Sequence, residues 1–266
     1  MGLQYFDLHS HVSFKDFDDD REQVIARMHE QGVGTITVGV DIQTSHEAVA
    51  FVENKDGFYA TVGLHPNDTP EERFDWAAFS KLAAHPKVVG VGECGIDYFR
   101  IVGDEVAEKK RQWEQFELQV DFAIQHDLPL MIHCRPRKGT VDAYEEVASY
   151  LEERSRASSK LRGNMHFFVG NVDVARRFYT IGFTTSYTGV LTFTHDYDEV
   201  VRFAPLDMLL TETDAPYAAP APFRGKRNEP SYVTHVVKAI AAIRGADEEG
   251  VRAEILENSK RMFGVV

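Results

Sequence analysis

The chain has 266 residues, of which 43% are hydrophobic and 27% are charged, and its formal net charge is -13. This length suits one substantial core and is usual for an α/β barrel, so we expect a single domain over residues 1–266. The negative charge argues against loose, charge-driven attachment to nucleic acid or to an anionic membrane. No apolar run reaches membrane-spanning length, the first residues lack signal-peptide features, and two cysteines are too few for a disulfide framework. We therefore expect a cytoplasmic protein without membrane association.

Short β-rich segments alternate with helical patterns along the chain, which is typical of repeated βα units. In the first half, strands are predicted at 4–11, 35–40, 59–65 and 88–93, and helices at 18–31, 44–55, 75–84 and 107–126. Thr44 or Ser45 is the expected N-cap of the second helix, and 95–105 the expected loop before the longest one.

The second half continues the alternation, with strands predicted at 129–133, 164–168, 183–187 and 208–214, and helices at 141–154, 172–181, 196–203, 231–244 and 247–263. Eight strands are the number that a closed parallel barrel needs, so a TIM-type (β/α)8 barrel is predicted. An open doubly wound sheet is the alternative, but no glycine-rich dinucleotide turn follows the first strand.

Polar side chains cluster where the predicted strands end, which is the rim on which barrel enzymes gather their catalytic groups. These residues are His9, His11, His65, Glu93, His133, His166 and Asp214. An HxH pair alone is as consistent with ordinary hydrogen bonding as with metal binding. Joined to the other histidines and to the two carboxylates, however, it offers more ligands than one ion needs, which favours a binuclear metal site.

The two cysteines each follow one of these polar residues. Cys94 comes after Glu93 and Cys134 after His133, so strand alternation turns both thiols away from the barrel mouth. Buried structural thiols are thus a better interpretation than a Cys-His nucleophile.

A basic loop follows the last predicted strand. Arg224, Lys226 and Arg227 lie within four positions of one another, shortly after Asp214. Such a loop could hold an anionic group brought to that carboxylate, or it could simply be solvated.

Motifs along nearly the whole chain resemble those of the TatD family of metal-dependent deoxyribonucleases. The matching segments are FDLHSH (6–11), VGLHP (62–66), GVGECGIDY (90–98), LPLMIHCR (128–135), HFFVG (166–170), GFTTSYTG (182–189), LLTETDAPY (209–217) and RGKRNEP (224–230). The chain departs from the family pattern at Phe167 and Val169, which replace a common cysteine and serine, and at Thr184 and Thr185. These changes remove no ligand but could reshape the substrate pocket.

The resemblance implies a barrel that hydrolyses phosphodiester bonds in DNA, often from a 3′ end, with two divalent ions that could be zinc, magnesium or manganese. It implies that His9, His11, Glu93 and Asp214 hold one ion and that Glu93, His133 and His166 hold the other, with Glu93 bridging. Nothing in the sequence indicates an obligate protein partner.

Two cations would lower the pKa of a bridging water and give a hydroxide near neutral pH, and they would neutralise charge on a phosphoryl oxygen. Asp214 is expected to orient this water and accept its proton, beside the bridging Glu93. His65 is expected to hydrogen-bond a phosphate or leaving oxygen, or to be merely structural.

Four further residues are expected near the substrate, namely Arg135, Arg224, Arg227 and Asp97. Arg135 and Glu212 share the strand parity of His133 and Asp214, so they could pair beneath the metals. Asp97 could orient a histidine or Arg224, or cap the loop after Glu93.

Three classes of function are left open by the sequence. The motifs favour a metal-dependent nuclease. The acidic surface leaves room for hydrolysis of a small phosphoester or an amide on the same barrel. A binding protein with a structural metal fits less well, because structural sites are saturated by four protein ligands.

Overall fold

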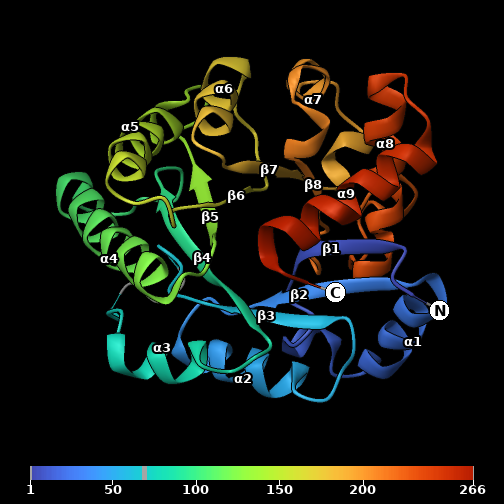
Figure 1. Cartoon of the computed structure of the whole chain (residues 1–266), viewed down its shortest axis with the longest axis horizontal. Coiled ribbons are helices and arrows are strands. Elements are labelled where there is room, and N and C mark those ends of the chain that lie inside the picture. The colour runs from blue at the N-terminus through green and yellow to red at the C-terminus, as the bar shows by residue number, and fades with distance from the viewer. Residues whose placement is uncertain (1, 68–70, 266) are drawn as a thin grey trace.

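A closed barrel of eight parallel strands forms the centre of the computed structural model, which describes residues 2–67 and 71–265. The strands follow one another around the barrel in chain order, with helices outside (Figure 1). The predicted TIM-type barrel is therefore confirmed. The strands are β1 (Tyr5–Ser10), β2 (Val33–Val38), β3 (Phe58–Val62), β4 (Val88–Asp97), β5 (Leu130–Arg135), β6 (Gly163–His166), β7 (Thr184–Tyr187) and β8 (Leu209–Thr211).

The helices in the described residues fill the connections between strands, except for the last two, which follow the last strand. They are α1 (Arg21–Gln31), α2 (Ile42–Val52), α3 (Trp76–Ala83), α4 (Glu105–His126), α5 (Asp142–Ala157), α6 (Val172–Thr180), α7 (Asp198–Phe203), α8 (Val233–Arg244) and α9 (Glu248–Phe263). Short 3-10 helices occur at Lys15–Phe17, Gly189–Thr192, Leu206–Met208, Ala221–Phe223 and Pro230–Tyr232. Within these ranges, no helix combines the length and the apolar character that a membrane crossing requires.

Three element predictions were wrong in detail. Helix α2 is capped by Asp41 rather than by Thr44 or Ser45, because Asp41 accepts the Thr44 N–H at 2.6 Å while the Thr44 hydroxyl accepts the Asp41 N–H at 3.0 Å. Strand β4 continues to Asp97, so the loop does not begin at residue 95. Strand β8 ends at Thr211, and Asp214 lies beyond it in a left-handed conformation with φ of 55°.

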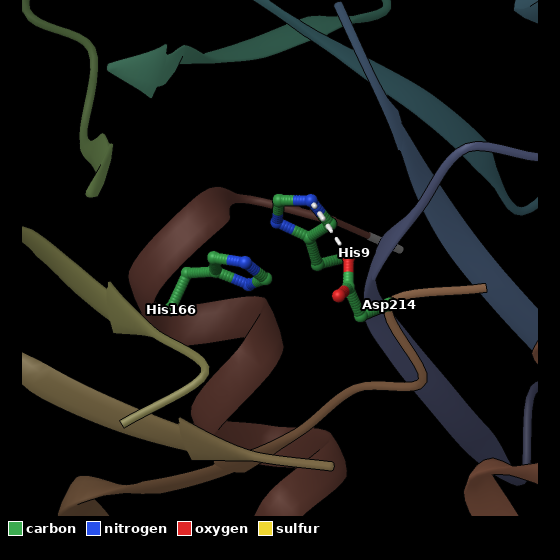
Figure 2. Close-up of side chains that lie close together, drawn as sticks. All are labelled: His9, His166 and Asp214. Atoms are coloured by element: carbon green, nitrogen blue, oxygen red, sulfur yellow. Dashed lines mark ion pairs between the residues drawn. The ribbon is translucent and has the colours of Figure 1, made fainter. Parts of the chain in front are cut away.

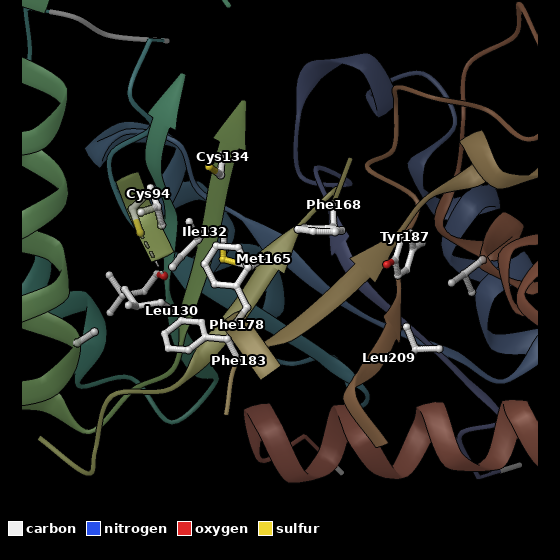
Figure 3. Packing of buried hydrophobic residues seen from close by; sticks show 14 of the residues in the cluster. Cys94, Leu130, Ile132, Cys134, Met165, Phe168, Phe178, Phe183, Tyr187 and Leu209 are labelled. Atoms are coloured by element: carbon white, nitrogen blue, oxygen red, sulfur yellow. Dashed lines mark hydrogen bonds between the residues drawn. The ribbon is translucent and has the colours of Figure 1, made fainter. Parts of the chain in front are cut away.

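The apolar core lies in two layers. The larger cluster packs the outer faces of the strands against the helices, and Figure 3 shows part of it around Met165, Phe178 and Phe183. The smaller cluster draws on strands β1 to β5 and β8, which can meet only inside the barrel, and it includes Leu256 and Phe263 of α9. Helix α9 therefore packs against this inner core, and the polar side chains are left at the carboxyl ends of the strands.

The barrel closes where the chain after β8 meets β1. Here the Asp214 N–H donates to the His9 carbonyl at 2.9 Å, and the His11 N–H donates to the Ala215 carbonyl at 2.7 Å. The carboxylate of Asp7 accepts the backbone N–H and the hydroxyl of Thr213, each at 2.7 Å. The backbone that closes the barrel thus carries three of the predicted metal ligands.

Candidate metal centre

The predicted ligands converge on the floor of one cavity of about 390 Å³. His11, His65, Glu93, His133, His166 and Asp214 line this cavity, and His9 lies fully buried beneath it. Each residue is in a strand or within a few residues of a strand's carboxyl end, where neighbouring parallel strands bring their side chains together. The structure therefore brings together all seven residues that the sequence singled out at the strand ends.

Glu93 lies at the centre of this group, and its two oxygens face different histidines. Oε2 lies 3.4 Å from His9 Nε2. Oε1 lies 2.9 Å from His133 Nδ1 and 3.6 Å from His166 Nε2. Burial alone would raise the pKa of Glu93, but the surrounding histidines hold it well below its usual value. Glu93 is thus an ionised carboxylate with one oxygen directed at each of two histidine groups.

Two of the histidines are oriented by a hydrogen-bond acceptor at one ring nitrogen, and a third has a carboxylate beside it. His11 Nδ1 lies 3.1 Å from the Val38 carbonyl, and His133 Nε2 lies 3.1 Å from Asp97 Oδ2. His166 Nδ1 lies at an ion-pair distance of 2.9 Å from Glu212 Oε1, although the contact lacks hydrogen-bond geometry. Burial lowers the pKa of His11, His133 and His166, but the adjacent carboxylates raise it above the usual value, to about 10 for His166, which favours the doubly protonated ring when no cation is bound. A bound cation would replace the proton on the inner nitrogen, while the outer nitrogen keeps its own. This is the arrangement that metal-binding histidines require.

His9 and His166 lie face to face, with ring centroids 3.6 Å apart, and the Asp214 carboxylate lies beside His9 (Figure 2). His9 Nδ1 is buried and has no hydrogen-bond partner among the described residues. Burial, together with the neighbouring His166, lowers the pKa of His9, which favours the neutral imidazole that binds metals.

His65 has the opposite orientation. Its Nδ1 accepts the backbone N–H of Asn67 at 3.2 Å, so the ring proton is on Nε2, which lies 3.6 Å from Glu93 Oε1. His65 therefore presents a hydrogen-bond donor to the cavity. This geometry suits a hydrogen bond to an oxygen better than a metal bond.

The donor set fits divalent ions. In the part of the chain that the structure describes, three groups have ligand atoms within 4.8 Å of one another, namely His9 with His11 and Glu93, His9 with His166 and Asp214, and His65 with Glu93 and His133. Imidazole nitrogens and carboxylate oxygens are ligands that zinc and related transition metals prefer. The convergence of these buried nitrogen and carboxylate oxygen atoms is consistent with a site built for cations.

Two predicted contacts of the surrounding residues had different outcomes. The carboxylate of Asp97 lies against His133 and also accepts the backbone N–H groups of Phe99 and Arg100, so it both orients a histidine and caps the following turn. The predicted pairing of Arg135 with Glu212 was wrong. Glu212 faces His166 and accepts the Ser186 hydroxyl, whereas the Arg135 guanidinium lies over the Phe99 ring at 4.1 Å.

The cations of the basic loop are not part of the cavity wall. Arg227 donates to the carboxylate of Asp20 at 2.6 Å and to the Asp16 carbonyl, and it lies over the Phe17 ring. Arg224 is exposed and stacks on Phe193 at 4.0 Å. We therefore expect Arg227 to stabilise the fold rather than to contact a substrate, while Arg224 lies outside the cavity.

The cysteines are buried and protonated. Burial raises the pKa of both thiols, which argues against a thiolate nucleophile. Cys94 lies in the outer core, as expected (Figure 3). Cys134 also packs in that core, but it touches the cavity wall, so its predicted separation from the mouth was only partly right.

Some cavity residues were not predicted from the sequence. Arg100, Phe14 and Tyr197 line the cavity, together with Tyr217, Phe167 and Val169 from the recognised motifs. Arg100 and Tyr197 come from irregular connections, where side-chain direction does not follow a period. The only available signal for Arg100 was its position three residues after Asp97.

A parallel barrel with buried imidazoles and carboxylates at its carboxyl rim is the architecture of a metal-dependent barrel enzyme. A family model described as TatD related DNase matches residues 6–264. The chain belongs to this family, as the resemblance of its motifs indicated.

Individual relatives agree with this assignment. The chain is 38% identical to an uncharacterized metal-dependent hydrolase, YabD, of Bacillus subtilis, over 98% of this chain and 99% of that protein. It is 30% identical to a 3′-5′ ssDNA/RNA exonuclease TatD of Pantoea vagans, over 97% and 98% of the two chains. The crystal structure of YJJV, a TatD homolog from Escherichia coli, superposes on all of this chain with a TM-score of 0.88 at 27% identity, and all of that chain is covered. The protein is accordingly a metal-dependent hydrolase of the TatD family.

Proposed function

We propose that this hydrolase cleaves phosphodiester bonds at an end of single-stranded DNA and uses two divalent ions. The observation that carries the proposal is the position of Glu93. One of its oxygens faces His9, and the other faces His133 and His166. A carboxylate placed between two sets of ligands is what a pair of ions would require of a shared ligand.

The residues assigned to each ion are those that the family resemblance implied. His9, His11, Glu93 and Asp214 would hold one ion, and Glu93, His133 and His166 the other. When bound, the ions would supply Lewis acidity for the phosphoryl group and would make water a stronger nucleophile at neutral pH.

The protein's own groups have distinct tasks in this proposal. Asp214 orients the attacking water and accepts its proton, because its carboxylate faces the cavity beside His9 and His11. His65 donates its Nε2–H to a phosphate or leaving oxygen. Arg135, which lies over Phe99, and Arg100 are the cations that line the cavity. They would hold phosphate oxygens near the metal centre.

The cavity has a size that suits one nucleotide at the end of a strand. About 390 Å³ is at the small end of the range for ligand pockets, roughly 300 to 1,000 Å³. Such a space admits the end of one strand more readily than a duplex. The exonuclease name of the Pantoea vagans relative supports the same substrate class.

A small phosphoester or an amide is the second candidate substrate. The specific observation in its favour is that, of the arginines and lysines the structure describes, Arg100 and Arg135 alone line the cavity, while the protein as a whole is strongly acidic. A small ester could rest on the metals without further phosphate contacts.

The test is reconstitution of the metal-stripped protein, ion by ion, with single-stranded DNA, duplex DNA, RNA and a chromogenic phosphodiester as substrates. Each ion should be titrated with the parent protein and with Asp214→Asn as the inactive control. Release of single nucleotides from single-stranded DNA supports the proposal. Efficient turnover of the small diester, with no cleavage of any polynucleotide, would replace it with the second candidate.

A further inference from the structure

One wall of the cavity differs in character from the floor. Phe167 and Val169 after β6, with Tyr197 before α7, line it and present mainly apolar surface. The adjoining part is lined by Arg100, shortly after β4, and by Arg135, the last residue of β5. An aromatic wall therefore adjoins the part of the cavity where a phosphate would be held.

Phe167 is held in an unusual backbone conformation. Its φ of 46° lies in the left-handed region, which is a genuine outlier for a bulky side chain and persists only where the surroundings enforce it. Its N–H donates to Glu212 Oε1 at 2.6 Å, and the next N–H, of Phe168, donates to the Ser186 carbonyl at 3.0 Å. The turn thus fixes Phe167 at the cavity.

The turn directs neighbouring side chains to different environments. Phe168 is buried in the outer core (Figure 3), whereas Phe167 and Val169 are only partly buried and line the cavity. The Val169 N–H is fixed by the Tyr144 hydroxyl at 3.0 Å. Phe167 and Val169 thus give this part of the cavity wall its apolar character.

We infer that Phe167, supported by Val169 and Tyr197, is the subsite for the nucleobase of the terminal nucleotide. This rests on the proposed function. A base is planar and is joined through its sugar to the phosphate at the metal centre, so it can reach the adjoining wall. Phe167 and Val169 carry no hydrogen-bonding side-chain group, and every base has a π-face. The subsite therefore binds bases by stacking, with little preference among them.

The inference is tested by removing the base and the ring separately. The substrates are single-stranded oligonucleotides that end in a normal or an abasic nucleotide, made with the change at either end. The variants are Phe167→Ala, Phe167→Leu and Phe167→Tyr. Phe203→Ala is the matched control, because Phe203 is a partly exposed aromatic residue of the outer helix α7. Metal content is measured for each protein.

Phe167→Ala and Phe167→Leu should raise KM about tenfold for the base-bearing end, the scale of one lost stacking contact, and leave KM for the abasic end unchanged. Phe167→Tyr should restore the parental KM, and Phe203→Ala should have no effect. Equal losses on both substrates would overturn the inference, because Phe167 would then act through Glu212 and His166.

Equilibrium binding separates this inference from the proposed function. The parent should bind deoxyadenosine monophosphate about tenfold more tightly than deoxyribose 5-phosphate, and Phe167→Ala should abolish the difference. If the parent cleaves no oligonucleotide yet shows this preference, the nuclease proposal fails and the base subsite stands. If the two ligands bind equally to the parent, the base subsite is wrong whatever the activity.

Discussion

Glu93 connects the two histidine groups through its separate oxygens, so its replacement should affect both ions. Glu93→Gln keeps the size of the side chain and removes its charge. We expect bound metal to fall from about two ions per chain to less than one, because neutral amides are weak metal ligands. Elemental analysis after gel filtration measures this, with Glu248→Gln on the exposed first turn of α9 as the control. Full metal content in Glu93→Gln would exclude a bridging role.

Asp214 allows the catalytic step to be separated from folding. Asparagine tolerates the left-handed conformation that Asp214 adopts, so Asp214→Asn should leave the backbone in place. The lost proton acceptor should lower kcat by roughly a hundredfold or more. The measurement is kcat at saturating metal, with circular dichroism to verify the fold. An equally active variant would show that Asp214 is not the proton acceptor.

Much of the site was predictable at the level of single residues, because ligands at strand ends follow a simple rule. His9, Glu93 and His166 come together as the parallel barrel requires. The partner of Glu212 was not predictable from parity. Parity gives the side of a strand that a residue faces, but the neighbour it meets there depends on how adjacent strands are staggered.

At the level of elements, the two arginines of the basic loop after Asp214 are expected to have different roles. Arg227 is bonded to Asp20 of the segment before α1 and packs on Phe17. Arg227→Ala should therefore lower the free energy of unfolding by about 1 kcal/mol, since the pair is partly exposed and the lost packing adds to it. Urea denaturation of the two single variants and the double variant with Asp20→Ala gives the coupling. Additive losses would mean that the two side chains do not interact.

Arg224 belongs to the same loop but is expected to affect substrate binding rather than stability. We expect Arg224→Ala to raise KM for oligonucleotides more than KM for a chromogenic diester, because a short substrate does not extend beyond the cavity. Steady-state kinetics on both substrates, beside Arg227→Ala, measure this. Equal increases on the two substrates would place Arg224 at the reacting phosphate or in the fold.

Element boundaries were the least predictable part of the fold. The pattern of apolar residues located every strand, but β4 runs four residues further than predicted, from Glu93 to Asp97. Gly95 was taken as the start of a loop, whereas in the structure an added Cβ would clash with the His133 carbonyl of the next strand. The glycine is required by close strand pairing, which a single segment does not reveal.

At the scale of the whole molecule, the net charge of -13 opposes binding of a polyanion. Affinity must then come from the metals and from a few cations, of which Arg100, Arg135 and Arg224 are the candidates. Three phosphate contacts on a single strand predict a salt dependence with a logarithmic slope of about -2. Oligonucleotide binding between 50 and 200 mM salt, roughly the range over which such slopes are read, measures it. A much steeper slope would reveal an extended binding surface.

The closure between β1 and the segment after β8 has a consequence for the whole fold. Asp7 and Thr213, which help to close it, are separated by 206 positions, so nearly the entire chain is a loop between them. An ion bound by His9, His11 and Asp214 would hold the two ends of that loop together, as a cross-link does. Separation of β1 from the segment after β8 would release the ion. Bound metal should therefore slow hydrogen exchange first at the amides of His11 and Asp214. The ion that serves catalysis would then also stabilise the closed barrel.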